Sequence, residues 1–136
     1  MAGAGREAER GVEVKLILPA FSDVPWVFYA ERYYFSKLLK SGIKIYERRN
    51  AILHAKTAVI DGIWSTVGSA NIDAWSFFYN NEDNAVILSR RFAFDMECMF
   101  DDDIGESNEI HLDEWEERSV TYKIKEWFAH LFARWM

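Results

Sequence analysis

The sequence predicts a mixed α/β fold in which a β-sheet is flanked by helices. Apolar runs of strand length alternate with helically spaced segments in the first half of the chain. An Asp-Gly pair at 61–62 separates two β-prone runs, which is typical of a hairpin. At 136 residues the chain is long enough to bury one core. We therefore expect a polar N-terminal segment over 1–10 and a single domain over 11–136.

The first elements are predicted from their composition and their stop signals. Residues 11–19, GVEVKLILP, form a Val, Leu and Ile run that ends at a proline, as in a strand buried on both faces at the centre of a sheet. The spacing over 26–40 predicts a helix, and Ser41-Gly42 is a typical helix end. A short strand over 43–46 and a charged loop over 47–50 are expected next.

The second half predicts a hairpin, a further strand and two helices. The hairpin pairs 53–60 with 64–69 across the Asp-Gly turn. The later expectations are a strand over 85–88, a helix over 90–102, an acidic loop over 101–109 and an amphipathic helix over 119–136. Within the helix at 90–102, Cys98 is expected to be a buried thiol, and a lone cysteine forms no internal disulfide.

Charge and composition exclude some classes of function. The formal charge of −6 argues against a long nucleic-acid groove, because phosphate backbones require a basic surface. No stretch approaches the roughly 18 apolar residues of a membrane span. The run Asp101 to Asp103 is interpreted as a solvated helix end rather than a metal site.

The last predicted helix leaves two alternatives open. Its apolar residues follow helical spacing and are flanked by Lys and Arg; they are Ile124, Trp127, Phe128, Leu131, Phe132 and Trp135. Packing of this stripe against the rest of the protein is the default interpretation, because an exposed stripe would be a large apolar patch. A helix lying on a membrane surface is the alternative.

The stretch HAKTAVIDGIWSTVGSAN, residues 54–71, collects polar groups suited to phosphate chemistry. Alternate residues of a strand face the same way, so His54 and Lys56 share one face of the sheet. The returning strand brings Gly68-Ser69 toward the start of the first strand, and Asn71 follows. Ammonium, hydroxyl and amide groups donate hydrogen bonds to a tetrahedral oxyanion, and imidazole can attack phosphorus.

Two carboxylates near this stretch have different interpretations. Asp61 lies five residues after Lys56, an odd interval, so on an unbroken strand it faces away from that lysine. A role in the turn or in a structural ion pair is therefore predicted for Asp61. Glu82, in NNEDN, could hold the second ring nitrogen of a nucleophilic histidine and fix its tautomer.

The pattern HxKxxxxD followed after six residues by GSxN resembles the HKD motif of the phospholipase D superfamily. It matches at His54, Lys56, Asp61, Gly68, Ser69 and Asn71. From about residue 10 to the C-terminus, and most closely over 42–88, the sequence is similar to the second half of bacterial cardiolipin synthases. The resemblance implies a phospholipase D-like half that carries one HKD repeat and is truncated at its N-terminus.

The resemblance also implies roles for individual residues. His54 would be one of two paired histidines, of which one forms a phosphohistidine and the other protonates the leaving alcohol and deprotonates the incoming one. Lys56, Ser69 and Asn71 would hold the phosphate, and Glu82 would be the acidic partner of a histidine. The reaction would move a phosphatidyl group between two phosphatidylglycerol molecules at a membrane surface, without a metal or an organic cofactor.

The chain carries one such motif, and a complete site in the superfamily pairs two. Neither His111 nor His130 has a lysine two residues further on. The second motif is therefore expected from a homodimer partner or from an N-terminal half. The expected location is bacterial, with the isolated chain soluble and the enzyme associated with the membrane on its cytoplasmic side. The alternatives are a homodimeric phosphodiesterase or nuclease of the same superfamily and an inactive half-domain.

Overall fold

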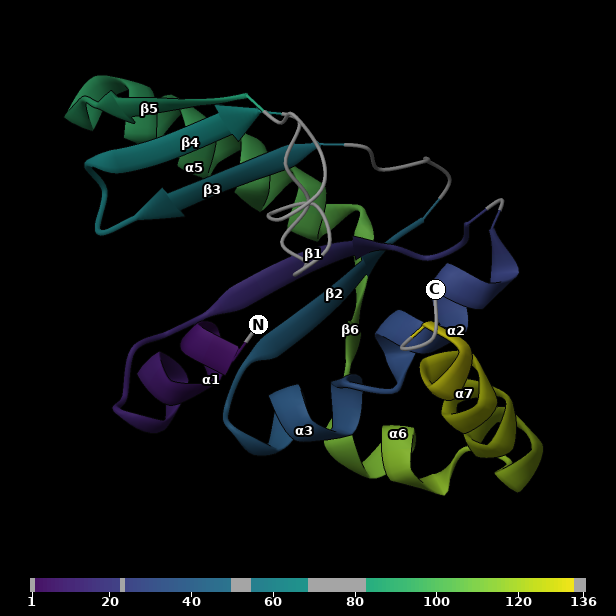
Figure 1. Ribbon diagram of the computed structural model, residues 1–136. Helices are drawn as coiled ribbons and strands as arrows, with labels where there is room; N and C mark the ends of the chain where they lie inside the picture. The colour runs from purple at the N-terminus through teal and green to yellow at the C-terminus, as the bar shows by residue number, and fades with distance from the viewer. Residues whose placement is uncertain (1, 23, 50–54, 69–82, 134–136) are drawn as a thin grey trace. The chain divides into compact units, whose positions relative to one another are not determined.

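The protein is described by a computed structural model that covers residues 2–22, 24–49, 55–68 and 83–133. The chain separates into two compact units. The terminal unit comprises residues 2–52 and 107–136, and the motif unit comprises residues 53–106. Each unit combines strands and helices, so the predicted mixed α/β class is confirmed (Figure 1).

The terminal unit is built on a three-stranded sheet with the order β1-β2-β6. Strands β1 (Lys15–Pro19) and β2 (Lys44–Arg48) are parallel, and β6 (Ser107–Ile110) runs antiparallel to β2. Among the described strands, β2 rather than β1 therefore lies between two neighbours. Its side chains at Ile45 and Tyr46 are buried.

The core of this unit forms where helices meet β2. Phe35, Leu38, Ile43, Ile45 and Trp115 make up the buried cluster. Helix α1 (Ala2–Glu9) contributes partly buried alanines to it. Helices α3 (Phe35–Lys40) and α6 (Leu112–Glu117) contribute aromatic rings, whose centroids lie 5.1 Å apart for Phe35 and Trp115.

The single helix predicted over 26–40 is two helices, α2 (Pro25–Arg32) and α3, separated at Tyr33 and Tyr34. The Tyr34 amide donates to the Glu31 carbonyl at 3.1 Å, a tight i→i+3 turn. The turn places the Tyr33 ring against the imidazole of His130, with centroids 4.1 Å apart. A contact with a residue so distant in sequence cannot be detected from helical spacing.

The predicted end of α3 is confirmed. Gly42 adopts a φ of 89°, which a glycine adopts without steric cost. Its amide donates to the Leu39 carbonyl at 3.0 Å, and the Ile43 amide donates to the Leu38 carbonyl at 3.2 Å. This pair of bonds is the Schellman arrangement, and the buried side chains of Leu38 and Ile43 complete it.

The prediction of an acidic loop over 101–109 is wrong. Residues 101–105 extend α5 (Arg90–Gly105), and Ser107–Ile110 form β6. The strand is short and mostly polar, so its sequence lacks a β signal; its backbone is stabilised by the register that pairs Ile110 with Ile45. Helix α6 was likewise not predicted, and the final helix is α7 (Val120–Ala133), close to its predicted range.

The motif unit is a three-stranded antiparallel sheet with the order β3-β4-β5, packed against α5. The strands are β3 (Lys56–Ile60), β4 (Trp64–Gly68) and β5 (Asn84–Leu88). Ser89 caps α5 by accepting a hydrogen bond from the Phe92 amide at 3.3 Å.

The buried side of the motif unit includes Ser65 on β4 and Ala93 and Met96 on α5. The buried thiol predicted at Cys98 is wrong, because Cys98 is exposed. It lies two residues after Met96, so the helical repeat turns it away from the buried face of α5.

Candidate functional site

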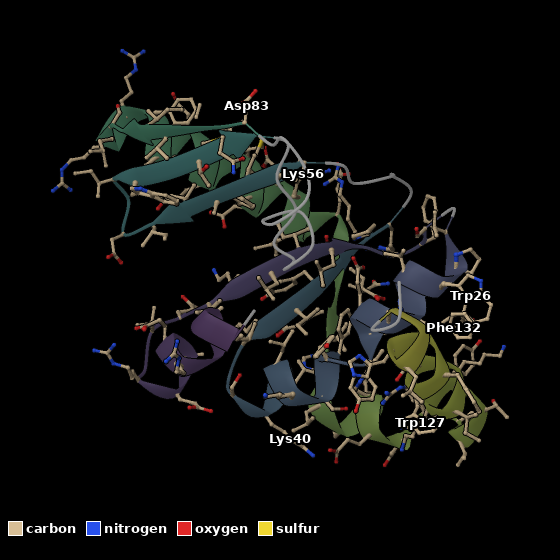
Figure 2. The ribbon with its side chains drawn as sticks, viewed as in Figure 1. Trp26, Lys40, Lys56, Asp83, Trp127 and Phe132 are labelled. Carbon is tan, nitrogen blue, oxygen red and sulfur yellow. The ribbon has the colours of Figure 1, made fainter. Side chains whose placement is uncertain are left out.

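The HKD stretch is positioned by the pairing of β3, β4 and β5. Lys56 is paired with Gly68, and Gly68 is paired with Asn84, so these three residues form one row across the end of the sheet. Figure 2 shows Lys56 and Asp83 at this same end. The lysine of the HxK segment, the end of the strand leading into GSxN and the start of β5 are therefore neighbours in space.

The opposite end of the hairpin is the predicted Asp-Gly turn. Asp61 and Gly62 adopt positive φ angles of 52° and 60°, as the central residues of a type I′ turn do. The Ile63 amide donates to the Ile60 carbonyl at 3.3 Å and closes the turn. Asp61 thus lies at the end of β3 away from Lys56, and its side chain is exposed.

Gly68 occupies a position with no space for a side chain. A Cβ at this residue would lie 2.7 Å from the Asn84 Cα, and closer still to the Asp83 carbonyl oxygen and the Asn84 Oδ1. Two of these three atoms belong to the backbone, which cannot rotate away as a flexible side chain can. The glycine of GSxN therefore permits β4 and β5 to approach closely beside Lys56.

The remaining predicted site residues, His54, Ser69, Asn71 and Glu82, lie outside the described residues. In the sequence, His54 precedes Lys56 by two residues, Ser69 follows Gly68 directly, and Glu82 precedes Asn84 by two. The sequence analysis did not predict that Asp83 and Asn84 would lie beside Gly68. The signal that could have found them is the NNEDN run that opens the last strand of the sheet.

The two histidines outside the motif, His111 and His130, lie in the terminal unit. His130 stacks on Tyr33, and its Nδ1 lies 3.3 Å from the Tyr34 hydroxyl oxygen. His111 is exposed and precedes α6 at the N-cap position.

Neither a metal cluster nor a membrane span is found in the part of the chain that the structure describes. Within it, no three or more His, Cys, Asp or Glu side chains are grouped as metal ligands would be. None of its helices combines the length and the apolar character that crossing a bilayer requires.

Comparison with known proteins places the chain in a family. Residues 4–104 match the family model described as "Cardiolipin synthase, PLD-like domain". The chain is 37% identical over 126 residues, 93% of its length, to cardiolipin synthase A of Serratia proteamaculans. It is 39% identical over 116 residues, 85% of its length, to cardiolipin synthase 2 of Bacillus anthracis.

These relatives are longer proteins. The matched region is 26% of the Serratia protein and 23% of the Bacillus protein, so the chain spans about a quarter of their length.

A solved structure supports the fold. The phospholipase D family member Nuc from Salmonella typhimurium superposes with a TM-score of 0.67, over 79% of this chain and 70% of that chain. The two are 22% identical, so the likeness shows the fold alone. Because the family model covers most of the chain, and because the hairpin carries the lysine and the aspartate of the HKD pattern on a phospholipase D fold, the chain belongs to the PLD-like domain family of cardiolipin synthases.

Proposed function

We propose that this chain supplies one half of the active site of a phosphatidyltransferase of the cardiolipin synthase type. The observation that carries the proposal is the identity of 37–39% to proteins named cardiolipin synthases over most of the chain. The row formed by Lys56, Gly68 and Asn84 supports it, because the pairing of the strands brings the lysine of HxK beside the glycine of GSxN. In this proposal residues 11–136 act as one phospholipase D-like domain.

In the proposed reaction, an imidazole nitrogen attacks the phosphorus of one phosphatidylglycerol. A phosphorus–nitrogen bond forms, the bond from phosphorus to the headgroup glycerol oxygen breaks, and the second histidine gives that oxygen a proton. The second histidine then takes the proton from a hydroxyl of another phosphatidylglycerol. That oxygen attacks phosphorus, the phosphorus–nitrogen bond breaks, and cardiolipin and glycerol are the products. His54 fills one of the two histidine roles.

The other motif residues would stabilise charge on the phosphoryl oxygens. The ammonium of Lys56, with Ser69 and Asn71, would donate hydrogen bonds to them, and Glu82 would orient a histidine. The proposal requires His54 and Ser69 to act beside the Lys56–Gly68 pair, from which they are two residues and one residue away in the sequence. Asp61 would act in the hairpin turn rather than on the substrate, because it lies at the other end of β3.

The second histidine would come from a second copy of the chain or from a further segment carrying another HKD motif. The substrates would be phosphatidylglycerol or related phospholipids at a membrane surface. The relatives are bacterial proteins, and a cytoplasmic membrane face is proposed as the site of action. The net charge of −6 argues against nucleic acid as the substrate.

The test is a chimera in which the rest of a cardiolipin synthase supplies the second HKD motif. This chain would replace the segment it matches in the Serratia cardiolipin synthase, and cardiolipin formation from phosphatidylglycerol vesicles would be measured. Activity that His54→Ala abolishes is expected. A folded chimera without activity, or one unaffected by His54→Ala, would refute the proposal.

The isolated chain should be assayed in parallel over a wide range of protein concentration. Product that rises steeply with concentration would mean that two copies complete one site. No product at any concentration, with an active chimera, would mean that the second motif comes from another segment. Cleavage of DNA by the isolated chain, without transfer of a phosphatidyl group, would instead favour the phosphodiesterase alternative.

A further inference from the structure

Helices α2 and α7 of the terminal unit pack together and share an exposed surface rich in aromatic side chains. We call the surface formed by Trp26, Ile124, Trp127, Phe128 and Phe132 the α2–α7 aromatic surface. Each of these side chains is between 50% and 64% exposed. Figure 2 shows Trp26 and Phe132 side by side where the helices meet, and their ring centroids lie 6.0 Å apart. Such a concentration of exposed large apolar residues marks a surface that binds something.

The default expectation that the apolar stripe of α7 packs against the rest of the protein is wrong for its described members, which are 38% to 64% exposed: Ile124, Trp127, Phe128, Leu131 and Phe132. Ala129, at 1% exposed, lies on the packed side of the helix, whereas Trp127, Phe128 and Phe132 remain outside. A groove of about 380 Å³ opens between the two helices beside them. It is lined by Pro25, Trp26, Tyr29, Ile124, Lys125 and Phe128.

The exposed charged side chains of α7 are positive, although the chain carries −6. The only acidic residue of α7 is Glu126, which is 3% exposed and paired with Arg118. Lys123 and Lys125 are exposed, and the Lys123 ammonium donates a hydrogen bond to the Glu116 carbonyl at 2.7 Å. The Lys125 ammonium lies 5.7 Å from the Tyr29 ring centroid and 5.6 Å from that of Tyr122, so it borders the apolar groove directly.

We propose that the α2–α7 aromatic surface binds the surface of an anionic phospholipid bilayer, with α7 lying in the plane of the interface. Trp and Tyr rings favour the boundary between acyl chains and headgroups, where an apolar body and a polar edge are both accommodated. Phe128 and Ile124 would enter the acyl boundary, and Lys125 would remain among anionic headgroups.

A second copy of the chain suits this surface less well. In a twofold interface the same patch meets itself, so the lysines of both copies would be brought into one interface and would repel each other. An anionic bilayer instead offers charge of the opposite sign to Lys123 and Lys125, beside an apolar phase for the rings.

This inference deepens the proposed function, because an enzyme that acts on lipids must reach them in a membrane. The role of the binding in catalysis rests on the proposed function, whereas the binding itself does not. The surface contains no residue of the HKD motif. Its test measures binding rather than turnover, so the failure of one proposal is distinguishable from the failure of the other.

The experiment is flotation of the full chain with vesicles of phosphatidylglycerol and phosphatidylcholine in equal amounts, compared with vesicles of phosphatidylcholine alone. We expect binding to the anionic vesicles that weakens as salt is added. Phe128→Ala should weaken it about tenfold, because an apolar aromatic contact with the bilayer is lost. Lys125→Glu should also weaken it about tenfold, through loss of one attraction and gain of one repulsion.

Two matched controls make the same kinds of substitution at exposed residues outside the α2–α7 aromatic surface. Phe94→Ala removes a 62% exposed phenylalanine from α5 of the motif unit, and Lys37→Glu reverses an exposed lysine on α3. Both should bind within about twofold of the unmodified chain, and circular dichroism checks that every variant folds. Absence of binding to anionic vesicles, or equal effects of Phe128→Ala and Phe94→Ala, overturns the proposal. A concentration-dependent dimer that Phe128→Ala dissociates, without vesicle binding, would assign the surface to a second copy instead.

Discussion

The guanidinium of Arg118 donates hydrogen bonds from two nitrogens to both carboxylate oxygens of Glu126, and the Nε–Oε1 distance is 3.1 Å. The Glu126 side chain is 3% exposed, so this fork lies in the interior. The same guanidinium lies 4.0 Å from the ring centroid of Trp115. One arginine therefore joins α7 to the aromatic core beside α6 and keeps the only carboxylate of α7 away from its outer surface.

Arg118→Met should lower the free energy of unfolding by about 3–5 kcal/mol, because it leaves a buried carboxylate without its partner. Urea-induced unfolding followed by circular dichroism measures the change. Adding Glu126→Gln to Arg118→Met should recover part of the loss, since the unpaired charge is removed. The matched control is Arg10→Met, which breaks an exposed pair with Glu7 and should cost at most about 1 kcal/mol. Equal effects at the two arginines would contradict the prediction.

Gly68→Ala should destabilise the motif unit by about 1–3 kcal/mol, because the added methyl group meets the backbone of Asp83 and Asn84. Gly105→Ala is the control, since a Cβ there has nothing within 4 Å. That change should be neutral or slightly stabilising. Hydrogen exchange of the β4 and β5 amides locates the effect. Unchanged protection of both strands in Gly68→Ala would show that the close approach is not required.

Glu47 should make stability fall as the pH rises above the pKa that its carboxyl has in the unfolded chain. Burial raises the pKa of the Glu47 carboxyl above its ordinary value, although the paired Arg32 lowers it. A raised pKa means that the folded state holds the proton more tightly than the unfolded state does. The contribution is therefore fully present below the unfolded pKa and is lost as the pH rises through the folded pKa.

The measurement for Glu47 is the difference in unfolding free energy between the unmodified chain and Glu47→Gln, followed upward in pH from about pH 4, near the ordinary pKa of a glutamate, to about pH 8. Taking the difference cancels the contributions of groups that titrate in both proteins. Glu13 is one such group, and its hydrogen bond with Lys44 lowers its pKa. We expect the unmodified chain to lose stability relative to Glu47→Gln through this window and then to reach a plateau. A gain instead would mean that attraction to Arg32 outweighs the burial of the carboxylate.

Lys56 and Asp61 belong to the same sequence motif but should respond differently to substitution. In the chimera, Lys56→Ala should reduce transfer by about 100-fold or more, because a donor to the phosphoryl oxygens is lost. Asp61→Asn should remain within about threefold, since asparagine tolerates the positive φ of this turn position equally well. Initial rates of cardiolipin formation test both. Equal losses would assign Asp61 a role in the chemistry rather than in the turn.

Several features of the fold could be predicted because the residues that determine them are close in sequence. The Asp61-Gly62 turn and the Gly42 helix end depend on backbone preferences of one or two residues. Helix α7 follows from apolar spacing along a single segment. The spacing of His54, Lys56 and Gly68 likewise carries the family resemblance, because all three belong to one short stretch of the chain.

The tertiary structure decided the features that depend on contacts distant in sequence. Strand β6 is stabilised by its register against β2, which lies some sixty residues earlier, and its own residues carry no β signal. The separation of α2 from α3 accompanies the stacking of Tyr33 on His130, and the neighbours of Gly68 depend on how β5 pairs with β4. The sequence alone thus determined the motif and the local turns, because backbone preferences are local. Pairing and packing instead depend on which distant segments bury surface and satisfy hydrogen bonds together.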